Sequence, residues 1–221
     1  MQKRTKTIIG IVAIVLVVLS IAIYFLFPKI WGSIVYPLKY EEYIIKYAKE
    51  YDLDPAYLSA VLYSESKFNP DAVSRAGARG LMQVMPSTGK FIAERFGNYN
   101  FSVNDLHDPE TSIKYGAWYL RDLLNRYNND EEVALAGYNG GPGVANRYVV
   151  SRSHSVIPRE TSGYLKTVMN AKEKYKELYY QELYTQGVSA ENVAEQLKIE
   201  QEQPEKTWWQ KIVDSVKEIV Q

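Results

Sequence analysis

The sequence predicts a single N-terminal transmembrane helix followed by an all-α globular domain. An uncharged apolar run lies near the N-terminus, and apolar residues after it recur mostly at helical spacing. Alternating strand patterns are scarce. With 46% hydrophobic and 24% charged residues, the composition is that of a globular protein rather than a disordered one. The 221 residues leave room for one domain of ordinary size or two small ones.

The apolar run has the length of a membrane span. Lys6 and Lys29 bracket it, and the stretch from Ile8 to Phe27 is almost wholly apolar. Its twenty residues rise ~1.5 Å each and span ~30 Å as a helix, the thickness of the bilayer hydrocarbon. We therefore expect residues 1–28 to form a short N-terminus and a membrane anchor at 8–27. A cleaved signal peptide is the alternative, although its apolar region is usually shorter and no small-residue cleavage site follows this run.

Charge around the run predicts its orientation. Lys3, Arg4 and Lys6 precede it, whereas Lys29 and Lys39 follow it. This slight excess places the N-terminus in the cytoplasm. We therefore expect a single-pass protein of the cell membrane whose catalytic domain is extracytoplasmic. Residues 1–6 hold three of the 26 basic residues, so the remainder carries 23 basic and 26 acidic side chains.

Residues 29–39, with Gly32 and Pro37, are expected to form a connector, and 40–185 the globular domain. The first helix of the domain follows from apolar and tyrosine residues at helical spacing over 40–51. Asp54-Pro55 and Asp108-Pro109 each combine a capping residue with a first-turn proline, and so predict two helix starts. Asp130 opens a further helix that we expect to stop near Gly137. A last long helix is expected from 160 past 175, with at most a small hairpin in 98–107.

The tail differs from the domain. Residues 186–203 are polar and rich in Glu and Gln. After Pro204, apolar residues beginning with Trp208 and Trp209 form a stripe with Lys and Glu opposite. We expect 186–221 to be a polar linker and an amphipathic helix. That helix docks on the domain or on another chain, or it lies on the outer membrane surface.

Composition also excludes several classes of function. The chain has no Cys, which removes disulfides, thiolate metal sites and cysteine nucleophiles. Its two His, His107 and His154, are too few for most zinc sites, and we expect no metal. The formal net charge is zero, which argues against nucleic-acid binding through a basic field.

Glu65 is the residue that most plainly suggests chemistry. Leu58, Val61 and Leu62 precede it by seven, four and three residues, which places Glu65 on the same helix face as these apolar residues. A carboxylate on a core-facing stripe loses hydration, and its pKa rises. A protonated Glu at the edge of a core is what a general acid requires. Pairing with an Arg or a backbone cap is the alternative.

Three motifs follow in order. Glu65-Ser66 comes first, and Gly80-Leu81-Met82-Gln83 follows a Gly-rich bend over 74–80. Ala136 to Pro142 comes last and places Tyr138-Asn139 before two glycines and a proline. This combination resembles the lytic transglycosylases of the soluble-transglycosylase type, which have a lysozyme-like fold. The resemblance covers roughly residues 40–175. A later Ile-Pro-x-x-Glu-Thr-x-x-Tyr pattern is matched only loosely, by Ile157 to Tyr164, and suggests Tyr164 as an active-site tyrosine.

The resemblance implies an activity that needs one carboxylate and no cofactor. The family cleaves the MurNAc–GlcNAc β-1,4 bond of peptidoglycan without water. One Glu, here Glu65, protonates the glycosidic oxygen and then takes a proton from the sugar's 6-hydroxyl, which closes a 1,6-anhydro ring. Ordinary glycosidases need two carboxylates. The sequence offers no second acid in a comparable motif, and Asp71 after Asn69-Pro70 is typical of a turn.

The same resemblance implies substrate-binding roles, each with a structural alternative. Gln83 binds the sugar amide or the oxygens near the scissile bond, or it braces its loop. Asn139 binds the N-acetyl group, or it is a left-handed turn residue. Tyr138 and Tyr164 contact sugar or orient Glu65, or they pack in the core. Ser66 bonds Glu65 or the glycan, or it bonds the end of its own helix.

The predicted partners are peptidoglycan glycan strands and the cytoplasmic membrane. Two other functions remain open. A muramidase on the same fold would let water attack, and a non-catalytic wall-binding or scaffold protein would keep the groove but would have little use for a buried acid.

Overall fold

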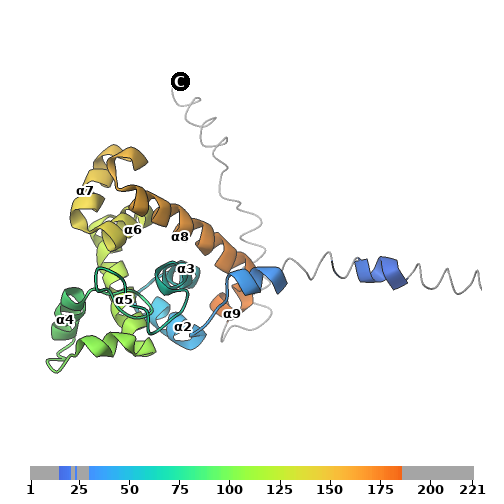
Figure 1. The fold of residues 1–221 in the computed structure, drawn as a ribbon, viewed down its shortest axis with the longest axis horizontal. Helices are drawn as coiled ribbons and strands as arrows, with labels where there is room; N and C mark the ends of the chain where they lie inside the picture. The colour runs from blue at the N-terminus through green and yellow to red at the C-terminus, as the bar shows by residue number, and fades with distance from the viewer. Residues whose placement is uncertain (1–14, 21–22, 24–29, 186–221) are drawn as a thin grey trace, which may run out of the picture. The chain divides into compact units, whose positions relative to one another are not determined.

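The computed structural model describes residues 15–20, 23 and 30–185, and this part of the chain contains helices and no strand (Figure 1). The predicted all-α class is therefore confirmed for these residues. The α-helices are α2 (Glu41–Glu50), α3 (Pro55–Ser66), α4 (Pro86–Arg95), α5 (Pro109–Arg126), α6 (Glu131–Gly140), α7 (Pro142–Ser151), α8 (Arg159–Leu178) and α9 (Tyr180–Tyr184), and the 3₁₀ helices are η1 (Val103–His107) and η2 (His154–Val156).

Aspartate caps set the starts of the helices that the sequence predicts. The Asp54 carboxylate accepts from the backbone N–H of Ala56 at 2.8 Å, and Asp108 accepts from that of Thr111 at 2.8 Å. Asp130 does the same for Val133 at 2.9 Å. Each bond satisfies a donor that would otherwise have no partner in the first turn.

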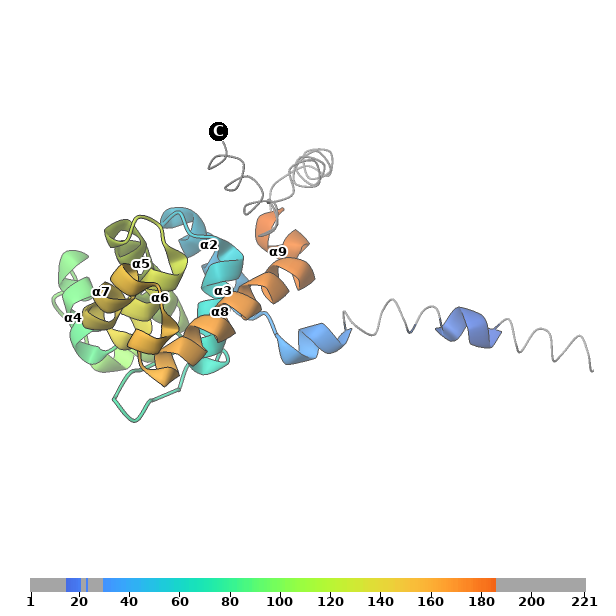
Figure 2. The same cartoon turned by 90° about the horizontal axis from the view of Figure 1, so that it is seen from above.

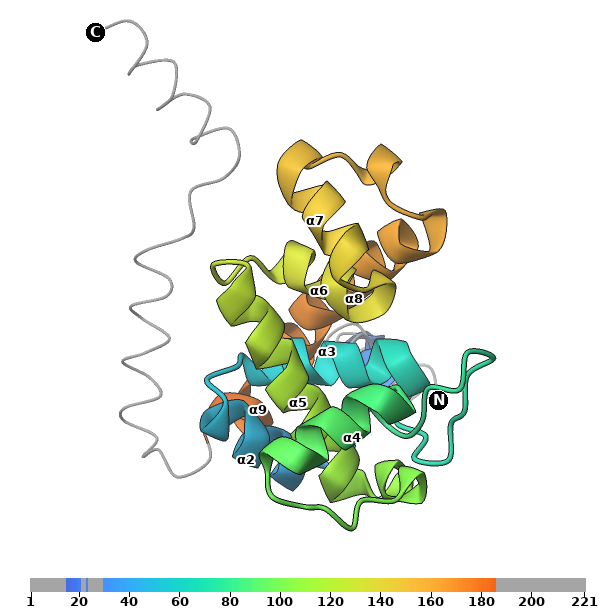
Figure 3. The ribbon, with the colours of Figure 1, turned by 90° about the vertical axis from the view of Figure 1, so that its left-hand side faces the viewer.

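Helix α3 is the centre of the domain. In Figure 3 it crosses the middle of the molecule, with α6 and α7 to one side and α4 to the other. Every residue from Ala56 to Leu62 is buried, so the helix is enclosed on all sides rather than along one stripe. The predicted core-facing stripe of Leu58, Val61 and Leu62 is buried, and so are the other faces of this part of α3. Glu65 owes its burial to the position of its helix in the centre of the fold.

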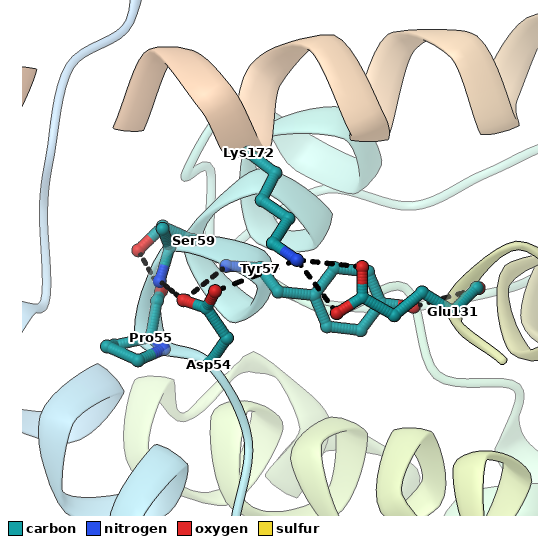
Figure 4. Close-up of polar contacts among 7 residues, drawn as sticks. Asp54, Pro55, Tyr57, Ser59, Glu131 and Lys172 are labelled. Carbon is teal, nitrogen blue, oxygen red and sulfur yellow. Dashed lines mark hydrogen bonds and ion pairs between the residues drawn. The ribbon is translucent and has the colours of Figure 1, made fainter. Parts of the chain in front are cut away.

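Helix α8 packs against α3 and crosses it (Figure 2). A polar group that we call the Lys172 cluster joins the first turns of α3 and α6 to α8 (Figure 4). The Lys172 ammonium donates to both carboxylate oxygens of Glu131 at 2.8 Å and lies 3.7 Å from Asp54. The buried Tyr57 hydroxyl donates to the Glu131 carbonyl at 3.1 Å. The cluster fixes the position of α8 relative to the first turns of α3 and α6.

Two segments differ from expectation because of local turn chemistry. In place of a hairpin in 98–107, η1 forms, opened by a capping box between Ser102 and Asp105. Helix α6 runs past Gly137 to Gly140, because the break comes at Gly141, whose φ of 81° favours glycine.

Helices α4 and α7 were not expected. Both begin with a proline, Pro86 and Pro142, which suits a first helical position.

The predicted anchor and tail fall largely outside the described residues, which exclude 1–14, 21–22, 24–29 and 186–221. Within the described part of the chain, no helix combines the length and the apolar character needed to cross a bilayer. The expected connector is partly helical, over residues 30–35. Its end is bonded to the domain, since the hydroxyls of Tyr175 and Tyr179 donate to the carbonyls of Pro37 and Tyr36 at 2.9 and 2.8 Å.

Candidate active site

Glu65 of α3 and Tyr164 of α8 meet where the two helices cross, and Glu65 borders a groove. Glu65 lies in the last turn of α3, which ends because Lys67 and Phe68 both take left-handed backbone angles, φ 54° and 60°. Tyr164 lies in the second turn of α8, and its hydroxyl donates to Glu65 Oε1 at 2.6 Å. The structure therefore brings together two of the residues that the sequence predicts for the site.

Burial raises the pKa of Glu65 from its ordinary value of 4.5 to about 7, and the hydrogen bond from Tyr164 partly opposes this rise. A carboxyl group of this kind holds its proton in much of the population at neutral pH and also exists as a base. Burial, with the nearby Glu65 charge next, also raises the pKa of Tyr138 and Tyr164 well above their ordinary value. Both hydroxyls therefore stay protonated and remain hydrogen-bond donors.

Two adjoining pockets form the groove. One of about 610 Å³ opens beside Glu65, and one of about 270 Å³ lies next to it. The two pockets share four lining residues, Gln83, Met85, Tyr138 and Asn139. Three of these are predicted substrate-binding residues, and they border the carboxyl group as the resemblance implies.

Gln83 is held on a tight loop between α3 and α4. Its backbone adopts φ 48°, and its side-chain amide nitrogen donates to the carbonyls of Ala72 and Gly80 at 3.1 and 2.9 Å. The side chain braces its loop and lines both pockets. Because the amide nitrogen is engaged twice, the amide oxygen is the atom that can accept a bond from a ligand. Gly80 has φ 74°, and a Cβ there would lie 1.8 Å from the Leu106 carbonyl oxygen, so only glycine fits.

Tyr138 and Asn139 come from the last turn of α6. The Tyr138 hydroxyl donates to the Met82 carbonyl at 2.8 Å, which ties α6 to the Gln83 loop. Asn139 is exposed and helical, and it does not take the left-handed turn conformation that was its structural alternative. Its amide is accessible to a ligand in either pocket.

Ser66 is not among the residues that line either pocket. Its hydroxyl lies 2.8 Å from the Leu81 carbonyl and 3.3 Å from the Leu62 carbonyl, and it donates to these rather than to Glu65. It holds the loop that follows α3 against the end of that helix. Its predicted contact with glycan stays a prediction.

Three further charged or aromatic residues line the groove without having been predicted as site residues. Arg75 and Glu160 line the larger pocket with Glu65, and Tyr119 lines the smaller one with its ring 5.5 Å from Tyr138. Glu160 stands within the loosely matched pattern, which could have revealed it. Arg75 lies in an unpatterned bend and Tyr119 in an ordinary helical stretch, so no spacing singles them out. Asp71 lines neither pocket, and its backbone N–H donates to the Asn69 side chain, as in a turn.

No group of three or more His, Asp and Glu side chains is placed to hold a metal ion in the described residues. The chemistry that the groove can perform is proton transfer at Glu65, next to hydrogen-bonding groups suited to a sugar. The groove is open and partly polar, with room for an extended chain.

Comparisons with known proteins show which family this domain resembles. The family model for the Transglycosylase SLT domain matches residues 42–157. The soluble lytic murein transglycosylase of Salmonella typhimurium is 31% identical over 153 residues, which cover 64% of this chain and 24% of that protein. Membrane-bound lytic murein transglycosylase C of Edwardsiella ictaluri is 37% identical over 114 residues, 48% of this chain and 32% of that protein.

Among solved structures, the 70 kDa soluble lytic transglycosylase of Escherichia coli superposes with a TM-score of 0.60 at 31% identity. The match covers 67% of this chain and 26% of that one. The chain thus spans about a quarter of the length of the first relatives it matches. Since the matched segment 42–157 is more than half of the chain and holds Glu65, Gln83, Tyr138 and Asn139, the chain belongs to the Transglycosylase SLT domain family.

Proposed function

We propose that this protein is a membrane-anchored lytic transglycosylase that cleaves the MurNAc-β-1,4-GlcNAc bonds of peptidoglycan and leaves 1,6-anhydro-MurNAc ends. The observation that carries the proposal is Glu65, a partly buried carboxyl whose pKa is raised to about 7 in a groove lined by hydrogen-bonding side chains. Membership in the Transglycosylase SLT domain family supports the same activity.

Glu65 serves first as the acid. Its proton passes to the glycosidic oxygen, the bond from that oxygen to the MurNAc anomeric carbon breaks, and the leaving sugar departs as an alcohol. The new carboxylate accepts the 2.6 Å hydrogen bond from Tyr164, which stabilises the charge. The residue is then prepared for its second role.

Glu65 next serves as the base. The carboxylate takes the proton of the sugar's own 6-hydroxyl, and that oxygen bonds to the anomeric carbon. Atoms and charge balance, water is not consumed, and Glu65 ends protonated for another cycle. Gln83, Tyr138 and Asn139 hold the sugars across the two pockets.

A muramidase is the second candidate, and Glu160 is the observation that favours it. This carboxylate lines the same pocket as Glu65, and two carboxylates flanking the bond are what a hydrolase uses. The two candidates differ in their product, because hydrolysis leaves a reducing end that contains an oxygen atom from water.

The anchor at 8–27 places this enzyme in the cytoplasmic membrane with its groove on the outer side, where the wall lies. The apolar length of the segment and the membrane-bound relative support this location.

Digestion of purified sacculi by the full chain in detergent tests the enzymatic proposal. We expect soluble muropeptides from the wild type and none from Glu65→Gln, with Asp71→Asn as a control of the same chemical change on an exposed turn. Equal release by wild type and Glu65→Gln, or release by neither, would contradict the proposal.

A further inference from the structure

The short helix over residues 30–35 has its apolar side chains on the outside. Ile30, Trp31 and Ile34 are 57%, 57% and 65% exposed, and they lie on one face because Ile34 follows the other two by four and three residues. Val35 borders that face and is 39% exposed. In a helix on the surface of a water-soluble domain, the apolar face points inward. This helix shows the reverse.

The inner face of the same helix carries small and polar residues. Gly32 lies against Leu178 of α8, so closely that a Cβ at Gly32 would come 2.6 Å from a Leu178 methyl carbon. Ser33 satisfies its hydroxyl within the helix by donating to the Ile30 carbonyl at 2.9 Å. Small residues toward protein and apolar residues away from it are the pattern of helices that contact lipid.

The segment is held to the domain by aromatic contacts as well. The Tyr36 ring lies 5.2 Å from the Tyr63 ring of α3 and 6.1 Å from the Tyr175 ring of α8. Together with the hydroxyl bonds from Tyr175 and Tyr179, these contacts attach residues 30–37 to the two helices that carry Glu65 and Tyr164. The connector is therefore a part of the domain rather than a free tether.

The sequence determines what lies opposite the exposed face. The apolar run predicted to span the bilayer ends at Phe27, three residues before Ile30, and three residues reach at most ~10 Å. That distance is comparable to the headgroup layer, and Trp is enriched in this layer. We propose that the face formed by Ile30, Trp31, Ile34 and Val35 inserts into the outer membrane interface and holds the catalytic domain against the bilayer.

This inference rests on the proposed anchor and adds a restriction on substrate. Helix α8 runs from Leu178, at the interfacial helix, to Tyr164, at Glu65, which is about 21 Å of helix axis. The catalytic carboxyl is then held within roughly that distance of the membrane surface. The enzyme would cut the glycan strands nearest the membrane and would not reach the outer layers of the wall.

Fluorescence of Trp31 in the full chain tests the placement. Trp118, Trp208 and Trp209 are changed to Phe, and the protein is reconstituted in vesicles of three parts phosphatidylcholine to one part phosphatidylglycerol. Replacing part of the phosphatidylcholine by a form brominated near the headgroup should quench Trp31, while acrylamide in the water should quench it little. Sacculus digestion by the same variant verifies that it is folded.

A matched variant separates the face from the anchor. Ile30→Gln with Ile34→Gln keeps the predicted span and should still float with the vesicles and digest sacculi in detergent, but it should lose quenching by brominated lipid. Trp31 quenched by acrylamide and not by brominated lipid would overturn the inference, and so would equal lipid quenching in the matched variant. Failure to float would remove the anchor and the inference together and would leave the lytic activity, measured on sacculi, as a separate result.

Discussion

The pKa of Glu65 is raised because α3 carries this residue into the domain, while the last turn of the helix reaches the groove. Glu65→Gln keeps the size of the side chain but cannot donate an acidic proton, so we expect activity on sacculi to fall by at least ~10²–10⁴-fold. A variant that retains a tenth of the wild-type rate would show that another group is the acid. Asp71→Asn should leave the rate unchanged.

The same substitution should change how stability depends on pH. The folded-state pKa of Glu65 is about 7, above its ordinary 4.5, so the folded state binds more protons between these values. The free energy of unfolding should therefore decline as pH rises from 4.5 to 7, by at most about 3 kcal/mol. Glu65→Gln should remove this decline. A slope that persists in the variant, measured by melting against pH, would assign it to other groups.

Tyr164 affects the pKa of Glu65. Its hydrogen bond stabilises the Glu65 carboxylate and lowers the pKa of that group. Tyr164→Phe removes the bond, so the pKa of Glu65 should rise and the alkaline limb of kcat/KM should move to higher pH. Tyr138→Phe is the control, because the Tyr138 hydroxyl bonds the Met82 carbonyl instead of the carboxyl. A limb that moves equally in both variants would assign the effect to packing.

Glu160 decides between one carboxylate and two. If Glu65 acts alone, Glu160→Gln should weaken substrate binding at most, raise KM and leave kcat within a few-fold of wild type. A second catalytic carboxylate would contribute ~10²-fold or more to kcat. Steady-state rates on a soluble glycan oligomer measure both constants. A collapse of kcat with unchanged KM would favour hydrolysis.

Among the helices, the site depends on the position of α8 relative to α3, because each of the two helices carries one partner of the bond between Glu65 and Tyr164. The Lys172 cluster fixes that position at the start of α3, and the bond between Glu65 and Tyr164 lies at the end of α3. The Lys172 side chain is 16% exposed, so Lys172→Met leaves partly buried carboxylates without their cation. We expect a loss of about 1–3 kcal/mol in the free energy of unfolding.

Lys174→Met is the matched control for that loss. Lys174 pairs with Glu177 on the solvent side of the same helix, where both side chains are about half exposed or more. Exposed pairs contribute ~0–1 kcal/mol, so denaturant titration should show little change. Equal destabilisation by both substitutions would mean that α8 itself, and not the cluster, was perturbed.

The elements also show what could be predicted from the sequence. Helices with an aspartate cap and a long apolar pattern, such as α3 and α5, were predicted closely, because their start signals are local. The short helix α7 was missed because the glycines on both sides of Pro142 indicate a loop equally well. The start of α4 was missed because Pro86 has no capping side chain before it. Their helical state follows from packing in the folded domain.

The site residues divide in the same way. Glu65, Gln83, Tyr138 and Asn139 stand in spaced motifs and line the groove, and Tyr164 reaches it through its hydrogen bond to Glu65. Ser66 stands in a motif as well, but its hydroxyl is directed to the Leu81 carbonyl by the loop that follows α3. The acceptor of a serine hydroxyl depends on tertiary contacts, and the spacing of residues in the sequence does not show these contacts.

For the whole molecule, charge contributes little to binding the wall. Beyond residues 1–6 the chain carries 23 basic and 26 acidic side chains, so an anionic polymer is not attracted by net charge. In the proposed function, affinity comes from contacts in the groove, and location comes from the proposed anchor and the proposed interfacial face. We therefore expect the membrane to determine where this enzyme cuts, and the groove to determine what it cuts.

The most direct test of the proposed transglycosylase mechanism is the mass of the products formed in water labelled with oxygen-18. Sacculi are digested by the wild-type chain, and the released muropeptides are measured by mass spectrometry. If Glu65 acts as acid and then as base, the new MurNAc ends should be one water lighter than reducing ends and should contain no oxygen-18. Reducing ends that carry the label would show that water attacks the sugar, and would contradict the transglycosylase mechanism.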